Sequence, residues 1–409
     1  MLELLLLLTA TGLALACDRR LGFGNPFQIY FLIWSLIFFA FYLFRETFVA
    51  VPMEYLLLML TAKALVLLLL LVIRIEFSNQ TGVNRHPSFN LRTHLIAVAQ
   101  VSVCFAAPFA YLRAKELAGG EDIFTVVGYI TLRSEMTDGG GQIGFLAYFS
   151  ILSYAVTSLT MLAYKKKAAG MLRLVFSSAV SLFYVYLSTG RTNLLLLFSL
   201  MLMPLILLEF VRVKSAIVAL FFVGLIFTFV AAMTAKGISL EAGFSENAIS
   251  LSENLRAYTV APFLAMSELM QTERTAEWGA NTFRFAISVM HALGVIEQPP
   301  AALIRDYVFV PDPTNVYTVY DVYFRDFSYL GIFIPPALLV FHWWLYRQGR
   351  KIGGRWVFYY AASVYPLAMQ FFQDQYFSLL SIWIQVGLWF WIFVVPERSI
   401  HEELRPRHA

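Results

Sequence analysis

The sequence predicts an all-α, polytopic integral membrane protein with about eleven transmembrane helices. Three observations predict it: 59% of the 409 residues are hydrophobic, only 14% are charged, and uncharged runs such as 216–235 are long. Soluble domains carry roughly a quarter charged residues, so this deficit indicates a bilayer as solvent. Each run is long enough to cross ~30 Å of hydrocarbon as a helix, which pairs its own backbone polar groups as lipid requires.

Hydropathy read in windows of about 19 residues gives the order of the elements. The expected spans are 2–17, 26–44, 52–73, 93–112, 143–164, 172–189, 193–211, 216–235, 328–346, 356–373 and 377–395. The first has no basic leading region and no cleavage motif, so we interpret it as a span rather than a removed signal peptide. Cys17 and Cys104 lie in or beside apolar helices, so we expect neither a disulfide nor a metal site from them.

Basic residues predict the orientation of the spans. Most of the 30 Lys and Arg residues lie in the short loops after odd-numbered spans and in the C-terminal tail. The positive-inside rule places these loops and the C-terminus in the cytoplasm, and the N-terminus outside. The net charge of +4 therefore encodes orientation and not nucleic-acid binding. The expected domains are a first bundle (1–235), a large outside loop containing helices (236–327), a second bundle (328–395) and a cytoplasmic tail (396–409).

The large outside loop indicates where the function resides. Helix-period apolar patterns at 257–270 and 282–295 predict that it is ordered, and long ordered loops are usually functional. The smaller outside loop, 113–142, contains the flexible run Gly139–Gly141. The sequence contains no GxGxxG, P-loop, HExxH, GxSxG or CxxC motif, so the chemistry must come from isolated polar residues.

Two candidate positions lie near the outer ends of spans. Arg191 follows Gly190 in a tight outside turn, where its guanidinium can bind a phosphate through two hydrogen bonds. The alternative is an arginine that reaches lipid headgroups. Glu253, Arg256 and Tyr258 begin a helical pattern in the large loop, near the membrane surface. The alternative there is a solvated helix start with a local Glu–Arg pair.

A third candidate pairs Arg284 with His291, seven residues later. This spacing places both side chains on one helix face, two turns apart. His291 can exchange protons near neutrality, although a single histidine at an interface is more often structural. Lys63 is the basic residue deep inside a span, and we expect it to face the bundle interior with a partner.

The densest polar segment is 312–327, which leads directly into the span at 328. Its aromatic rings and two-way hydrogen-bonding groups are typical of a sugar-binding surface. The candidate substrate-binding residues in it are Asn315, Tyr317, Thr318, Tyr320, Asp321 and Tyr323. Arg325 and Asp326 follow at the membrane boundary, where a lipid diphosphate would lie. The alternative is an aromatic belt with a charged flank. Gln370, Gln373 and Asp374, at the outer end of another span, either line the same cavity or solvate a helix end.

These segments, taken in order, resemble the O-antigen polymerase (Wzy) family of oligosaccharide repeat-unit polymerases. The resemblance rests on the overall topology and on four segments: Gly190–Thr192, Glu253–Tyr258, Thr314–Thr318 and Tyr323–Gly331. The last is similar to the family's tyrosine, aspartate-phenylalanine, glycine pattern before a late span. Ser328 stands where a glycine is common in the family.

The resemblance implies a membrane glycosyltransferase with a GT-C-like bundle in the bacterial inner membrane, its large loop in the periplasm. It implies that a growing glycan is transferred from one polyprenyl-diphosphate carrier onto a second lipid-linked repeat unit. Polyprenyl diphosphate leaves, so neither nucleotide sugar nor ATP is needed, and no cofactor or metal is expected. Membrane lipid and a chain-length regulator protein are the further partners that it implies.

The chemistry of the residues agrees with this activity. Arg191, Arg256, Arg284 and Arg325 all fall on the outer side, and converging guanidinium groups would stabilise a leaving diphosphate. A base must take the proton of the acceptor hydroxyl, and Asp326, Glu253, Asp321 and His291 are the candidates. Two other functions stay open: an O-antigen ligase, and a flippase or transporter of the same lipid-linked sugars. A transporter would carry polar groups at the midplane, whereas here they crowd one side.

Overall fold

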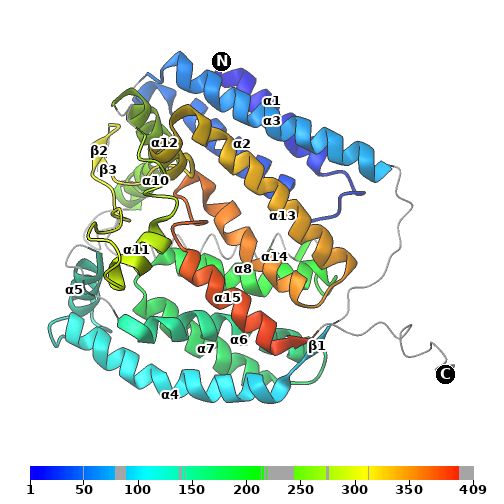
Figure 1. Ribbon diagram of the computed structural model, residues 1–409, viewed down its shortest axis with the longest axis vertical. Coiled ribbons are helices and arrows are strands. Elements are labelled where there is room, and N and C mark those ends of the chain that lie inside the picture. The colour runs from blue at the N-terminus through cyan, green and yellow to red at the C-terminus, as the bar shows by residue number, and fades with distance from the viewer. Residues whose placement is uncertain are drawn as a thin grey trace. The chain divides into compact units, whose positions relative to one another are not determined.

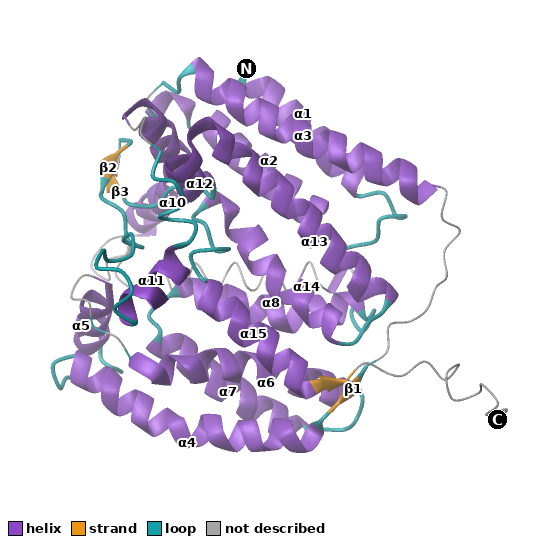
Figure 2. Cartoon of the chain, in the orientation of Figure 1, coloured by secondary structure: helices purple, strands orange, loops and turns teal. Residues whose placement is uncertain are grey.

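The computed structural model describes residues 1–48, 50–78, 89–137, 141, 143–212, 214–215, 218, 244–272, 276–311 and 313–395. The described part is mostly α-helical, with two short strand ladders (Figure 1 and Figure 2). Nearly all of the expected span 216–235, the start of the large loop and the tail 396–409 lie outside these residues.

The helices follow the apolar runs of the sequence closely. In the first half of the chain they are α1 (Leu2–Ala16), α2 (Pro26–Leu43), α3 (Met53–Ser78), α4 (Thr93–Leu117), α5 (Val126–Thr137), α6 (Ala147–Lys165), α7 (Met171–Leu187) and α8 (Arg191–Leu207). Later in the chain they are α10 (Phe244–Thr272), α11 (Arg284–Ala292), α12 (Tyr320–Phe327), α13 (Ile334–Lys351), α14 (Arg355–Ala368) and α15 (Leu380–Phe393). Short 3-10 helices are η1 (Arg45–Thr47), η2 (Gly144–Leu146), η3 (Ser328–Phe333) and η4 (Met369–Phe371).

Four two-residue strands form two antiparallel ladders. Strand β1 (Asn90–Leu91) pairs with β4 (Val394–Val395), with Asn90 opposite Val395. Strand β2 (Val308–Phe309) pairs with β3 (Pro313–Thr314), with Val308 opposite Thr314. These ladders fasten loops to their neighbours and do not change the helical class of the protein.

Five helical segments are long and apolar enough to cross a membrane. They are Pro26–Leu43, Met53–Glu76, Thr93–Leu117, Gly144–Lys165 and Tyr320–Lys351. Shorter apolar helices occupy Leu2–Ala16, Met171–Leu187, Thr192–Leu207 and Leu380–Phe393. The all-α membrane class predicted from composition is therefore confirmed. The candidate segment Tyr320–Lys351 includes α12 and η3, which precede or begin at the expected start of 328, together with α13.

The chain divides into two compact units. The first combines Met1–Val83, Ala231–Trp344 and Ser363–Ser381, and it contains α1, α2, α3, α10, α11 and α12. Helix α2 packs against α1 and α10, and a cluster of buried aromatic rings forms the centre. Trp34 contacts Phe38 and Tyr320, and Phe263 packs on Phe38 and Tyr55. This aromatic centre supports the inner side of α12, which carries the densest polar segment.

The second unit combines Asn84–Val230, Leu345–Ala362 and Ile382–Ala409. Its central helix is α6, which is buried without interruption from Ile151 to Ala163 and packs against α4, α7 and α8. Small polar side chains join α6 to α7: the Thr157 hydroxyl lies 2.7 Å from the hydroxyls of both Ser177 and Ser181. Small hydroxyl residues of this kind allow helices to approach closely in a lipid environment.

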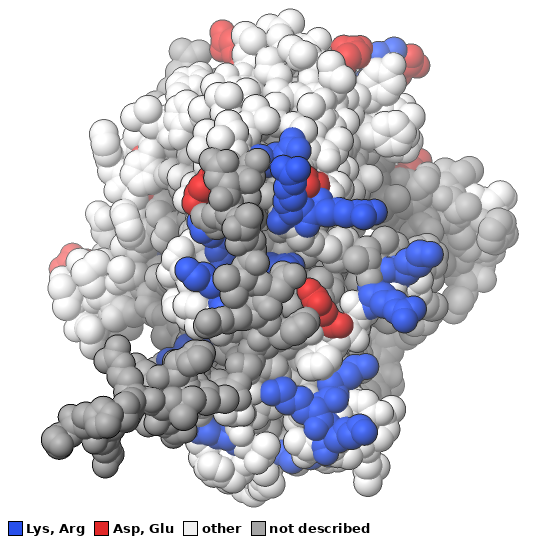
Figure 3. Space-filling view, turned by 90° about the vertical axis from the view of Figure 1, so that its right-hand side faces the viewer, with Lys and Arg blue, Asp and Glu red and all other residues white. Residues whose placement is uncertain are grey.

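Lys and Arg side chains predominate over Asp and Glu on the face drawn in Figure 3. The net charge of +4 agrees with this excess of basic side chains.

Candidate functional site

Helix α12 carries an acidic and a basic side chain one turn apart, Asp321 and Arg325. The i,i+4 spacing on a helix brings such a pair into contact. Nε of Arg325 donates to Oδ1 of Asp321 over 2.7 Å, and both side chains are about nine-tenths buried. Arg325 also lies over the ring of Tyr317, 5.6 Å from its centroid. The contact with Asp321 on the same helix thus fixes the direction in which the Arg325 guanidinium points.

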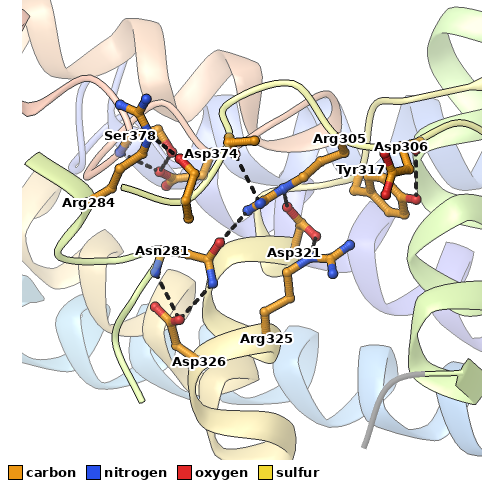
Figure 4. A network of polar contacts seen from close by, with 12 residues as sticks. Asn281, Arg284, Arg305, Asp306, Tyr317, Asp321, Arg325, Asp326, Asp374 and Ser378 are labelled. Atoms are coloured by element: carbon orange, nitrogen blue, oxygen red, sulfur yellow. Dashed lines mark hydrogen bonds and ion pairs between the residues drawn. The ribbon is translucent and has the colours of Figure 1, made fainter. Parts of the chain in front are cut away.

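The second oxygen of Asp321 binds a second arginine. Nε of Arg305 donates to Oδ2 of Asp321 over 3.0 Å, and its Nη2 donates to Oδ1 of Asn281 over 2.8 Å (Figure 4). A further bond joins Nη1 of Arg305 to the carbonyl of Ala302, at 3.1 Å. One carboxylate therefore orients two guanidinium groups, one from α12 and one from the irregular segment between α11 and β2.

Asp326 fastens the segment before α11 to α12. Its Oδ1 accepts from the backbone N of Asn281 at 3.0 Å and from Nδ2 of the same residue at 2.8 Å. Its Oδ2 accepts from the backbone N of Thr282 at 2.6 Å. The backbone N atoms of Glu277 and Trp278 donate to the carbonyls of Arg325 and Asp326, respectively. Asp326 is fully buried, so these bonds replace its water contacts and fix the start of α11.

A small pocket lies beside this network. Its walls are formed by Asn281, Arg284, Ala302, Leu303, Arg305, Asp321, Val322, Gln373 and Ser378. Nε of Arg284 donates to the carbonyl of Ala301 at 2.6 Å. Burial and the nearby charge of Arg305 lower the pKa of Arg284 from its usual value. In the described part of the chain the pocket is lined by two arginines and a single carboxylate, so it favours an anion.

A loop between η4 and α15 supplies the far wall of the pocket. Asp374 anchors this loop: it accepts from the hydroxyl of Tyr323 at 2.8 Å and from the backbone N of Tyr376 at 3.2 Å. It also accepts from the backbone N and the hydroxyl of Ser378, at 3.0 and 2.8 Å. Burial raises the pKa of Asp374 above its usual value although these donors oppose the rise. The loop is therefore preorganised, with Gln373 and Ser378 at the pocket.

Lys63 lies in an aromatic cage inside the first unit. Its Nζ donates to the hydroxyls of Tyr30 and Tyr320, at 3.1 and 3.0 Å, and lies 3.2 Å from the centroid of a Trp34 ring. The prediction of an interior position with partners is confirmed, since Lys63 is fully buried. The partners are neutral, and within the described residues no carboxylate pairs with it.

A chain of buried polar contacts continues from this cage. Trp34 donates from Nε1 to Oε1 of Gln370 at 3.2 Å, and Nε2 of Gln370 donates to the hydroxyl of Tyr376 at 3.3 Å. That hydroxyl lies 2.8 Å from Nε2 of His342, whose Nδ1 lies 3.0 Å from the hydroxyl of Ser363. Tyr376 belongs to the loop that Asp374 anchors. The same loop therefore contacts the polar chain from the aromatic cage and forms a wall of the pocket.

Several predicted site residues come together. Arg284, Asp321, Arg325 and Asp326 all lie in the network or at its pocket. Tyr317 is buried beneath Arg325 and donates to the carbonyl of Asp306 at 3.4 Å. The remaining residues of the dense segment surround α12 as follows: Asn315 is half-buried, Thr318 is buried, Tyr320 contacts Lys63 and Tyr323 contacts Asp374.

Other predicted residues are not part of this network. His291 is exposed on α11, and its Nδ1 lies 3.2 Å from the carbonyl of Ile296. Glu253 is exposed on α10, and the ring of Tyr258 stacks on Phe372. Arg256 lies on α10 with its side chain outside the described part of the structure.

Arg191 is the first residue of α8, in the second unit. Its side chain also lies outside the described part, as does Asp312 at the start of the dense segment. The expected convergence of Arg191 and Arg256 with the other arginines therefore stays a prediction.

Sequence reasoning missed Arg305 and the structural part played by Asn281. Arg305 lies between α11 and β2, where the backbone is irregular and no periodicity predicts a partner. The sequence did offer one signal: Arg305 is followed by Asp306 in the same expected outside loop that contains the dense segment. Among the described residues no group of three or more His, Cys, Asp and Glu side chains is placed to hold a metal ion.

The fold and the site define an α-helical membrane protein with a buried arginine–carboxylate network beside an anion-favouring pocket. A curated protein of Escherichia coli (strain K12) with the name "Putative O-antigen polymerase" is similar: 26% of 144 residues are identical. The match covers 34% of this chain and 35% of that protein, so about a third of either length is compared. No family model and no solved structure matches the chain.

Proposed function

We propose that this chain is a membrane glycosyltransferase that polymerises lipid-linked oligosaccharide repeat units of a surface polysaccharide. The observation that carries the proposal is the pocket lined by Arg284 and Arg305, in which Asp321 orients both Arg305 and Arg325. The similarity to a protein named as an O-antigen polymerase gives independent support.

In the proposed reaction an acceptor hydroxyl of one lipid-linked unit attacks the anomeric carbon of a glycan on a second carrier. The new carbon–oxygen bond forms as the bond to the diphosphate breaks, and polyprenyl diphosphate leaves with the electron pair. Arginine donates strong, charge-assisted hydrogen bonds to phosphate oxygens. Donors that are already fixed in a water-poor site stabilise the developing charge most effectively. Arg284 and Arg305 are assigned this role, with Arg325 in support.

The acidic residues of the network are assigned positioning roles. Both oxygens of Asp321 already accept from arginines, so its carboxylate is assigned to orienting them. Asp326 is fully engaged by Asn281 and Thr282. His291 is the stronger candidate base: a carbonyl only accepts, so the contact with Ile296 puts the proton on Nδ1 and leaves Nε2 as an acceptor. Glu253 is retained as the second candidate.

Further contacts to substrate are assigned to the predicted residues around α12. Asn315, Tyr317 and Thr318 would meet the sugars, while Tyr320 and Tyr323 are held by Lys63 and Asp374 and shape the wall behind them. Arg191, Arg256 and Tyr258 are retained as residues that complete the diphosphate site. We place the protein in the bacterial inner membrane with the large loop in the periplasm and the C-terminus in the cytoplasm. A chain-length regulator is the proposed protein partner.

The proposal is tested with purified protein and a defined polyprenyl-diphosphate-linked repeat unit, with and without EDTA. Polymer ladders on a gel are expected from the wild type and their loss from Arg284→Met and Arg305→Met. Arg113→Met is a matched control, because Arg113 is an exposed arginine of the second unit paired with Glu116. Transfer only to lipid A core would indicate a ligase, and movement of the unit across vesicles without new bonds would indicate a transporter. Either result would refute the proposed function.

A further inference from the structure

Helix α11 has two opposite stripes of different chemistry. Arg284, Ser288 and His291 recur at the spacing of one helix face. The other face carries Ala286, Val289, Met290 and, just beyond the helix end, Leu293, again at helical spacing. Arg284 lines the anion-favouring pocket, so the polar stripe begins at the site. The helix is therefore amphipathic, and the first residue of its polar stripe lines the pocket.

The apolar stripe of α11 is exposed in the part of the chain that the structure describes. None of the nine residues of α11 is buried. Val289 is 42% exposed, and Leu293 and Val295 are 73% and 67% exposed. An isolated helix of this length is marginal in water, and most helical stability comes from burying an apolar face. A medium that accepts this face must therefore adjoin it.

The start of α11 is fixed to the end of a membrane helix. The backbone of Asn281 and Thr282 donates to Asp326, and Trp278 donates to the carbonyl of the same residue. Asp326 lies near the beginning of the candidate span Tyr320–Lys351. Helix α11 therefore begins beside the first residues of that candidate span.

Large apolar side chains flank α11 on both sides. Trp278, before it, is 83% exposed, and Phe283 is 57% exposed. After it, Tyr307 and Phe309 on and beside β2 are 64% and 73% exposed. Tryptophan and tyrosine are enriched at membrane–water interfaces. Exposed apolar side chains thus both precede and follow α11 in the chain.

We infer that α11 is an interfacial helix, whose apolar stripe lies in the acyl boundary of a phospholipid bilayer while Arg284, at the start of its polar stripe, lines the pocket. Helices of this amphipathic type lie in the plane of the interface with the apolar face about 5–10 Å deep. Arg284 then lies at the level of lipid phosphates. The inference concerns the lipid contact of α11 and holds whether or not the protein transfers sugars.

The test uses single-cysteine variants in a background with Cys17→Ser and Cys104→Ser, reconstituted in nanodiscs of phosphatidylethanolamine and phosphatidylglycerol. Leu293→Cys and Val289→Cys report on the apolar stripe, and Ser288→Cys is the matched control on the polar stripe. Each is labelled with the fluorophore NBD. Quenching is compared between lipids with a doxyl group near the headgroup and aqueous iodide.

We expect doxyl lipid to quench the labels at 293 and 289 at least threefold more than the label at 288, with the reverse order for iodide. Equal iodide quenching at all three sites would overturn the inference, because the stripe would then face water. Protection from both quenchers only in discs that hold two copies would also overturn it, since a second copy of the chain would cover the stripe. Gel filtration of each labelled variant shows whether it is folded.

Discussion

Nε of Arg305 donates to Oδ2 of Asp321 over 3.0 Å, joining an irregular loop to the first turn of α12. Both side chains are largely buried, at 16% and 7% exposure. The contact fixes the direction of a guanidinium that lines the pocket. In the proposed reaction this preorganisation is what allows Arg305 to meet a diphosphate without rearranging.

Replacing Arg305 should therefore impair polymerisation far more than it impairs folding. A hydrogen bond to a charged group contributes about 1.5–3 kcal/mol, so Arg305→Met should lower kcat/KM by about 10- to 100-fold. Arg305→Lys keeps the charge and should recover only part of the activity, because an ammonium lacks the planar, two-pronged donor fork of a guanidinium. Initial rates of polymer formation check this, with Arg113→Met as the control. Full activity in Arg305→Met would contradict the assignment.

The Asn281–Asp326 contact should appear as a coupling free energy of unfolding. Asp326→Ala leaves the buried donors of Asn281 and Thr282 without an acceptor, which costs about 1–3 kcal/mol for each buried group. In a double-mutant cycle, Asn281→Ala and Asp326→Ala should be non-additive by about 0.5–3 kcal/mol. Denaturant unfolding in detergent measures the four proteins. Strict additivity would show that the two residues do not stabilise each other.

Lys63 should tolerate an apolar substitute of similar shape. Replacing a buried ionic group by a well-packed apolar one is often neutral or stabilising, and methionine adapts to irregular cavities. We expect Lys63→Met to keep the wild-type Tm and Lys63→Ala to lose about 2–5 kcal/mol through the cavity it leaves. Thermal unfolding in detergent compares the three. A Met variant as unstable as the Ala variant would mean that the charge itself holds the aromatic cage together.

Asp374 should make stability depend on pH in a defined direction. Burial raises the pKa of Asp374, so the folded protein holds this proton at a pH where the unfolded chain has lost it. Stability then falls as pH rises from the ordinary aspartate range through the raised pKa. The Tm of the wild type minus that of Asp374→Asn should therefore increase as the pH falls through the raised pKa of Asp374 toward the ordinary aspartate range. A difference that shrinks on acidification would show that Asp374 is stabilised as the anion.

The sequence predicts the helices well and the site in part, for physical reasons. Apolar runs long enough for a bilayer are visible without any tertiary information, so α2, α3 and α4 lie where hydropathy places them. The hydropathy window begins the late span at 328, after α12, because Arg325 and Asp326 count against an earlier start. The folded chain pairs both residues, which hydropathy does not register.

Local spacing also explains which site contacts were foreseeable. Arg284 and His291 share a helix because seven residues make two turns, and α11 confirms this. The bond between Asn281 and Asp326 joins residues 45 positions apart, and Arg305 reaches Asp321 from a loop. Contacts of this kind depend on how segments pack, which composition and periodicity do not encode.

The central claim is that the pocket lined by Arg284 and Arg305 holds the diphosphate of a lipid carrier. The most direct measurement is the Kd of a short-chain polyprenyl diphosphate for the protein in nanodiscs, determined by titration calorimetry at fixed salt. We expect binding at least about tenfold weaker for Arg305→Met and unchanged for Arg113→Met. Binding by Arg305→Met as tight as that of the wild type would contradict it.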